Sequence, residues 1–147
     1  MKRKLTIVLS LILIVSTISS IVLFSKAASD KKNVDVVEGW YEDLYTMYDK
    51  FYNQYLYYND RPYDEQAIKL DIPDDITIAC AAYGCWGTNY TDYKEYEVAF
   101  KKAYDDYKEA EKKMNTKNTF GVLFLIISIG CVIAIIVIRN KVSSEIQ

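Results

Sequence analysis

Apolar and charged positions are segregated along this chain. Residues 5–24 and 120–138 make up 39 positions, and none of these positions is Lys, Arg, Asp or Glu. A helix needs roughly 20 apolar residues to cross the ~30 Å hydrocarbon core of a bilayer. Each stretch therefore predicts a transmembrane helix, and the second of them also lacks proline.

The N-terminal apolar stretch admits two interpretations. The basic residues 2–4 precede it and small residues follow it at 25–27, which is the order of a signal peptide. Its 20 residues exceed the usual ~7–15 of a signal core and suffice to span, so a retained anchor is favoured over cleavage. In both cases positive charge favours a cytoplasmic N-terminus, with 25–119 extracytoplasmic and 139–147 cytoplasmic.

Between the two stretches, large apolar residues recur in alternating steps of four and three, the rhythm of helices that pack along a seam. Asp35 and Thr91 are the expected N-caps of two such helices. Because the seams match in length, we expect them to bury each other as an antiparallel helical hairpin. The seam residues are Val37, Tyr41, Leu44, Tyr48, Phe51, Tyr55 and Tyr58 in the first helix, and Tyr93, Tyr96, Phe100, Ala103, Tyr107, Ala110 and Met114 in the second.

The segment that joins these helices predicts a short helical tip. Helices over 63–70 and 74–83 would each follow a proline, which suits a first helical turn. Cys80 and Cys85 lie close enough in sequence to form a local disulfide in an oxidising compartment, with two free thiols as the alternative. The predicted fold class is all-α: two transmembrane helices flank an extracytoplasmic hairpin with a short, disulfide-stapled tip.

Composition excludes several kinds of chemistry. The chain has no histidine, which excludes Ser-His-Asp and Cys-His nucleophiles and His-ligated zinc. Residues 27–118 carry 12 Lys/Arg against 19 Asp/Glu, the wrong sign for binding nucleic-acid phosphates. No cofactor or metal site is expected, and the chain is not expected to be an enzyme.

All 14 tyrosines lie between the apolar stretches. Most occupy seam positions, where packing explains them, whereas those off the seams are candidates for partner binding because Tyr and Trp dominate binding hot spots. Trp86, on a turn after the cysteine pair, is either a lid over the tip or an exposed anchor. The candidate partner-binding residues are Trp86, Tyr83, Tyr45, Tyr52, Tyr57 and Tyr104.

Small residues within the apolar stretches predict how the two spans pack. Ser16 and Ser128 each lie eight residues from the outer end of their span, so they can meet across a helix–helix contact. Gly130-x-x-x-Ala134 is a motif that supports such packing or self-association. Since neither stretch contains an ionisable residue, ion-coupled transport is disfavoured.

These features favour a small, membrane-anchored, non-enzymatic interaction module of a bacterial cell envelope. Its expected partners are membrane lipid and an extracytoplasmic protein, as a subunit of an envelope or secretion complex or as a toxin immunity protein. The alternative is a membrane-active, holin-like or pore-forming homo-oligomer, which two short spans would permit.

Overall fold

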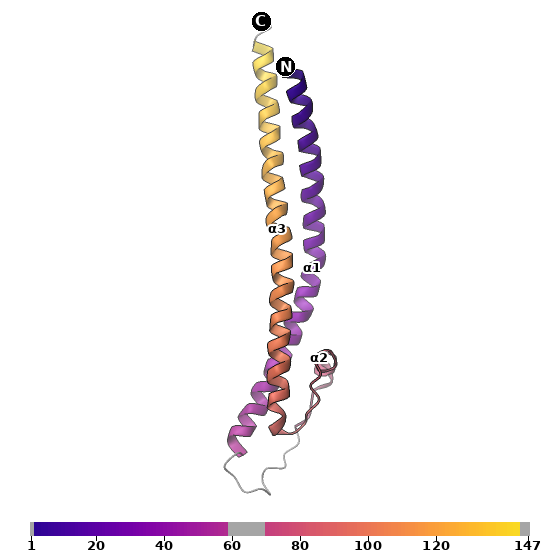
Figure 1. Cartoon of the computed structure of the whole chain (residues 1–147), viewed down its shortest axis with the longest axis vertical. Coiled ribbons are helices and arrows are strands. Elements are labelled where there is room, and N and C mark those ends of the chain that lie inside the picture. The colour runs from indigo at the N-terminus through magenta and orange to yellow at the C-terminus, as the bar shows by residue number, and fades with distance from the viewer. Residues whose placement is uncertain (1, 59–69, 145–147) are drawn as a thin grey trace. The chain divides into compact units, whose positions relative to one another are not determined.

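The computed structural model describes residues 2–58 and 70–144, with side chains described over 4–58 and 70–141. Every element within these residues is helical, so the all-α prediction is confirmed. Figure 1 shows the elements coloured in chain order: α1 (Lys2–Tyr58), η2 (Asp74–Ile76), α2 (Thr77–Tyr83), η3 (Tyr90–Asp92) and α3 (Tyr93–Ser144).

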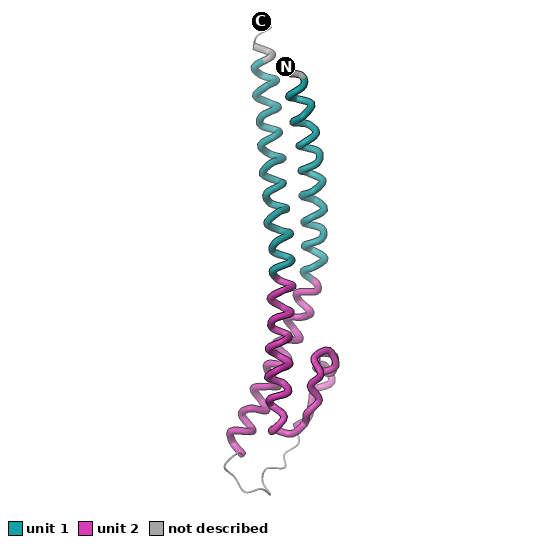
Figure 2. The backbone as a smooth tube through the Cα atoms, in the orientation of Figure 1, with its two compact units in different colours: residues 1–31, 112–147 teal, residues 32–111 magenta. Residues whose placement is uncertain are grey.

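The chain divides into two compact units, coloured in Figure 2. Unit 1 comprises Met1–Lys31 and Lys112–Gln147, and unit 2 comprises Lys32–Glu111. Helices α1 and α3 each contribute residues to both units, and α2 belongs to unit 2. The unit boundaries fall close to the predicted ends of the extracytoplasmic segment.

Helix α1 is continuous through the position where a new helix was expected to begin. Asp35 lies inside α1, so the prediction that it caps a helix is wrong. Residues 25–36 contain no glycine or proline, so no residue in this stretch ends the helix. The same reason applies to α3, which runs without a break through 112–119.

The start of α3 also differs from the prediction. Thr91 lies inside η3, and Asn89 is the N-cap of that turn instead. The backbone N–H of Asn89 donates to Asp92 at 2.9 Å, and the Asn89 side chain accepts a hydrogen bond in return, which completes a capping box. The sequence signal was present as Asn89 and Asp92, three residues apart.

The core of unit 2 uses more of each long helix than the predicted seams. Met47 on α1 and Ala99 on α3 are buried although neither lies on a seam, whereas Tyr48 and Phe100 are only partly buried. The reason is that the tip also packs against these helices. Residues Leu70, Ile76, Ala79, Cys80, Cys85 and Tyr90 join Leu44, Phe51 and Tyr96 in one buried cluster.

The tip contains the expected helix after Pro73. Turn η2 and helix α2 together cover the predicted range 74–83, which confirms a helix there. Helix α2 ends at Gly84, whose φ of 73° lies in the left-handed region that glycine adopts without a steric penalty. The helix predicted over 63–70 lies outside the described residues except for Leu70, which is not helical.

In unit 1 the usual pattern of burial is reversed. Helices α1 and α3 each contain a stretch long and apolar enough to cross a membrane. Large apolar side chains such as Ile14, Ile21 and Ile126 are exposed there, whereas small and polar residues are buried. The buried residues of these stretches are Ser16, Ser20, Gly121, Ser128 and Cys131.

Candidate functional site: an aromatic ladder on unit 2

Nine aromatic rings form a continuous series of contacts along α1 and α3 in unit 2. The contacts pair higher residue numbers on α1 with lower residue numbers on α3. Tyr41 contacts Tyr104 at 5.2 Å between ring centroids, and Tyr55 contacts Tyr93 at 4.7 Å. Each ring touches at least one neighbour within 6.5 Å. We call this series the aromatic ladder: Tyr41, Tyr45, Tyr48, Tyr52, Tyr55, Tyr93, Phe100, Tyr104 and Tyr107.

The ladder arises because each helix has a second aromatic face beside its core-facing one. Tyr41, Tyr45, Tyr48 and Tyr52 follow one another on α1 at intervals of three or four residues, which places them on one side of the helix. Phe100 fits between two of them, 5.4 Å from Tyr45 and 4.9 Å from Tyr48. The ladder is therefore packed internally and also presents ring surface to the outside.

Part of the ladder lines a groove with a volume of about 500 Å³. Tyr104 is 41% exposed beside it, and Tyr45, 46% exposed, contacts its Phe100 wall. Aromatic rings that are held in place but keep accessible surface lose little conformational entropy when a partner covers them. The groove is lined by Tyr41, Phe100, Lys101, Tyr104 and Asp105.

Charged side chains border the ladder. Lys101 pairs with Glu97, and Lys108 pairs with Glu111 at 3.0 Å. The Lys108 ammonium also lies 4.8 Å from the ring centroid of Tyr107, within the range of a cation–π contact. These lysines are held by neighbours on α3, so the border of the ladder is a set of matched charges rather than a basic patch.

Two of the ladder hydroxyls, those of Tyr48 and Tyr107, are not activated for chemistry. Desolvation, with a smaller contribution from Glu97, raises the pKa of Tyr48 above its usual 10.0. Desolvation also raises the pKa of Tyr107, next to Glu111 and Glu38. Both phenols therefore stay protonated at neutral pH, and they can donate and accept hydrogen bonds but do not supply a phenolate nucleophile.

The structure brings three of the six candidate partner-binding residues together. Tyr45, Tyr52 and Tyr104 belong to the ladder. Tyr57 contacts Tyr58 at the end of α1, outside the ladder. Tyr83 lies on α2, where its hydroxyl donates to Asp106 Oδ2 at 3.0 Å. The other ladder tyrosines occupy positions predicted as seam positions. Heptad spacing predicts them all as packing residues because it does not distinguish a buried helix face from a half-exposed one.

Trp86 is fixed at its backbone and exposed at its side chain. Its N–H and that of Gly87 both point to Glu95 Oε2, at 3.4 and 3.2 Å, and the Tyr96 hydroxyl donates to the Gly87 carbonyl at 2.9 Å. The indole is 54% exposed, so the interpretation of Trp86 as a lid is wrong. Trp86 is a second accessible aromatic residue of unit 2, on a loop that is held by α3.

Cys80 and Cys85 are free thiols in this structure, so the predicted disulfide is not formed in it. The N–H groups of Gly84 and Cys85 both donate to the Cys80 carbonyl, at 2.8 and 3.3 Å. This helix ending turns Cys85 back over Cys80, and the two thiols are hydrogen-bonded. Burial raises the pKa of Cys85 to about 12, so the folded pair is not a reactive dithiol.

Within unit 1, Ser16 and Ser128 meet in a hydrogen bond of 2.7 Å between their Oγ atoms. Two residues that the sequence analysis missed add to this contact: Ser20 Oγ donates to the Gly121 carbonyl at 2.9 Å. A Cβ atom at Gly121 would lie 3.0 Å from the Phe24 ring, so glycine permits the close approach of the helices there.

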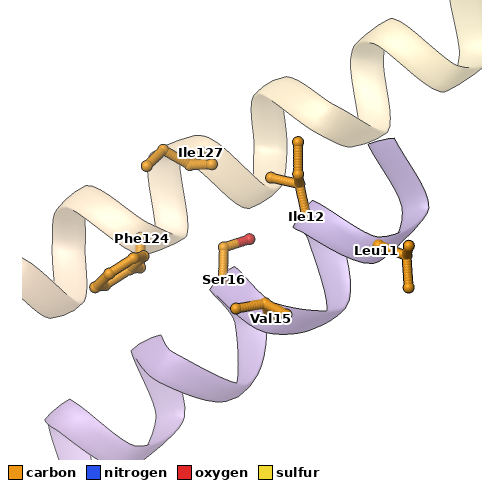
Figure 3. A pocket seen from close by; sticks show the side chains of 6 residues that line it. All are labelled: Leu11, Ile12, Val15, Ser16, Phe124 and Ile127. Atoms are coloured by element: carbon orange, nitrogen blue, oxygen red, sulfur yellow. The ribbon is translucent and has the colours of Figure 1, made fainter. Parts of the chain in front are cut away.

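The glycine of the Gly130-x-x-x-Ala134 motif does not take part in this helix–helix contact. Gly130 is exposed, and a Cβ atom there would meet nothing within 4 Å. Unit 1 also has an apolar groove, and Figure 3 shows the side chains from both helices that surround Ser16 in it. Its volume is about 310 Å³, and it is lined by Leu11, Ile12, Val15, Ser16, Phe124 and Ile127.

Among the residues with described positions, no group of three Cys, Asp or Glu side chains is arranged to hold a metal ion. No family model, curated protein or solved structure matches this chain.

Proposed function

We propose that this protein is a membrane-anchored, non-enzymatic interaction module of a bacterial cell envelope, and that its aromatic ladder binds an extracytoplasmic protein. The observation that carries this proposal is the ladder itself, a series of nine packed rings of which Tyr41, Phe100 and Tyr104 line a groove of about 500 Å³. Tyrosine, tryptophan and arginine dominate binding hot spots, and rings fixed by their neighbours are preorganised for that role.

The reversed burial of unit 1 supports the membrane anchor. A core helix of a soluble protein buries its apolar side chains, but Ile14, Ile21 and Ile126 are more than half exposed. In lipid this exposure costs nothing, and small or polar residues are then favoured between helices because they allow close approach and hydrogen bonds. Ser16, Ser20 and Ser128 are the polar residues found in that position.

The charge of the extracytoplasmic segment indicates the chemistry of the partner. Residues 32–111 of this segment, which form unit 2, carry 18 Asp/Glu against 8 Lys/Arg. An acidic surface attracts basic partners and repels anionic ones, and exposed tyrosine faces also accept Lys and Arg side chains through cation–π contacts. A basic protein segment that covers the ladder is therefore the favoured partner, for a complex subunit and for an immunity protein alike.

Photo-crosslinking in native membranes tests this proposal. A benzophenone amino acid at position 104 places the reactive group in the ladder groove, and one at Val98 is the control because that side chain is 69% exposed on the same helix. We expect a single protein adduct from position 104 and none from position 98. The replacement Tyr45→Ala should weaken the adduct, because it removes a ring that packs on Phe100.

Equal adducts from positions 98 and 104 would contradict partner binding at the ladder. No adduct from position 104, or the same yield with and without Tyr45→Ala, would also count against it. Trp86→Ala in parallel separates the ladder from the tip, since Trp86 is exposed on a different segment of unit 2.

A membrane-active homo-oligomer is the second candidate function. The observation in its favour is that Gly130 lies on an uncovered face of α3, where a second copy could pack. Ser16, Ser20 and Ser128, however, are buried between the two helices of unit 1, and the large residues exposed on the apolar stretches do not provide a polar lining for a pore. Leakage of a dye from vesicles containing the purified protein would favour this candidate over the interaction module.

A further inference from the structure

Basic residues lie at both ends of unit 1, and one of these two sets adjoins unit 2 in the chain. Residues 25–31 and 112–119 contain five lysines and a single acidic residue, Asp30. Lys117 pairs with Asp30, so the charge of this aspartate is already matched within the unit. The set carries a net charge of +4, and we call it the lysine collar: Lys26, Lys31, Lys112, Lys113 and Lys117.

The structure brings the two halves of the collar together. The ion pair between Lys117 and Asp30 joins α3 to α1, and the Phe24 ring meets the backbone of Gly121 next to it. The two contacts show that residues 24–30 of α1 and 117–121 of α3 lie side by side. Lys26, Lys31 and Lys112 are exposed, so their ammonium groups are accessible to a ligand.

The position of the collar matches the depth of lipid headgroups, given the membrane placement that the proposed function already assumes. At 1.5 Å per helical residue, the collar lysines lie about 3 to 12 Å beyond the ends of the apolar stretches at Phe24 and Phe120. The headgroup layer extends about 5–8 Å from the hydrocarbon core, and lysine side chains can bend toward it along their apolar stems.

The collar stands out against the charge of the remaining extracytoplasmic segment. Residues 32–111 are strongly acidic, with 18 Asp/Glu and 8 Lys/Arg. A collar of the opposite sign beside the apolar stretches complements an anionic membrane surface, where each nearby Lys or Arg contributes to attraction. We propose that the lysine collar binds the phosphate headgroups of anionic phospholipids in the outer leaflet.

Spin-label measurements on the full-length protein test this proposal. The protein is reconstituted in phosphatidylcholine vesicles that contain spin-labelled phosphatidylglycerol or spin-labelled phosphatidylcholine. We expect the fraction of motionally restricted label to give at least a roughly twofold preference for phosphatidylglycerol. The preference should fall as salt rises, because screening shortens the range of the attraction.

Matched variants locate the preference. The variant Lys26→Gln, Lys31→Gln, Lys112→Gln, Lys113→Gln should lower it, and the corresponding Lys→Arg variant should keep it. The control Arg139→Gln, Lys141→Gln removes charge at the opposite ends of the spans and should also keep it. Circular dichroism checks that each variant retains its helices.

Three results would overturn the proposal. The first is that the parent protein shows no preference for phosphatidylglycerol, and the second is that the Lys→Gln collar variant keeps the full preference. The third is that inorganic phosphate at constant ionic strength abolishes the preference of the parent protein, which would indicate a site for the free anion. In each of these cases restricted label would still be present, so membrane anchoring and the proposed function would stand. Absence of any restricted label would contradict the membrane anchor and the collar together.

Discussion

Phe51 of α1 and Tyr96 of α3 meet edge to face in the core of unit 2, with ring centroids 4.6 Å apart and neither residue exposed. Ring pairs in this geometry contribute about 0.5–1.5 kcal/mol beyond the burial of their surface. The Tyr96 hydroxyl continues from this core to the Gly87 carbonyl on the loop that carries Trp86. One residue thus ties the helix–helix core to the exposed tip.

Replacing Phe51 by alanine should destabilise unit 2 strongly. Removal of a fully buried phenyl ring costs about 3–5 kcal/mol, because the surrounding side chains relax only partly into the cavity. Chemical unfolding of the full-length protein in detergent, followed by circular dichroism, measures the effect. Tyr57→Ala is the control, since Tyr57 is 55% exposed, and a similar loss in both variants would refute this assignment of the core.

Tyr96→Phe should cost about 1–2 kcal/mol, because it leaves the Gly87 carbonyl without its 2.9 Å hydrogen bond while preserving the ring. Hydrogen exchange should also become faster in the loop that includes Trp86, which is the specific sign of a lost anchor. Tyr104→Phe provides the comparison at a partly exposed ladder position. If Tyr96→Phe unfolds like the parent and exchanges no faster, this hydrogen bond does not hold the loop.

The two glycines of the second apolar stretch should respond differently to leucine. Gly121→Leu forces a side chain against the Phe24 ring, where even a Cβ atom would lie at 3.0 Å, and should separate the helices of unit 1. At Gly130 an added Cβ atom would meet nothing within 4 Å, so Gly130→Leu should leave the pair intact. Resistance to unfolding by added dodecyl sulfate in mixed micelles compares them. The reverse order would place the helix contact at Gly130.

The buried thiol of Cys85 predicts a specific pH dependence under reducing conditions. Its pKa is raised from the usual 9.0 to about 12 in the folded state, mainly by desolvation. Below pH 9 the thiol is protonated in both states and its contribution to stability is complete. Between pH 9 and pH 12 only the unfolded chain gives up the proton, so that contribution is lost as the pH rises.

Cys85→Ala isolates this effect from the titration of other groups. The difference in free energy of unfolding between parent and Cys85→Ala should be constant below pH 9 and should change in favour of the variant above it. Urea unfolding at fixed pH values, with a phosphine reductant present, gives the two curves. Parallel curves up to pH 12 would show that Cys85 titrates normally in the folded protein.

The sequence predicted the helical class and the two helices long and apolar enough to span a membrane, because apolar stretches and helical spacing are strong local signals. It did not predict that α1 is continuous. Asp35 precedes an amphipathic stretch and is a residue type favoured at N-caps, and the sequence does not show that the helix already extends through it. It also missed Met47 as a core residue. That residue is buried only because the tip packs on a second face of α1, and no local pattern encodes this contact.

The candidate site was predicted in part for a similar reason. Tyr45, Tyr52 and Tyr104 were identified by their position off the seams, whereas Tyr41 and Tyr48 were assigned to packing. In the structure these five residues share one ladder, since a half-buried tyrosine packs through its ring and remains accessible through its edge and hydroxyl. Gly121 was missed because its role depends on Phe24, almost one hundred positions away in sequence.

The proposed roles of the aromatic ladder and of the lysine collar both require that the two apolar stretches span the membrane with unit 2 on the outer side. Labelling of single introduced cysteines with a membrane-impermeant maleimide in intact cells tests this placement most directly. The native cysteines are buried, so the parent protein provides the background. We predict that Lys31→Cys reacts in intact cells and Lys141→Cys reacts only after lysis. Labelling of Lys141→Cys in intact cells, or protection of Lys31→Cys until lysis, would contradict the account.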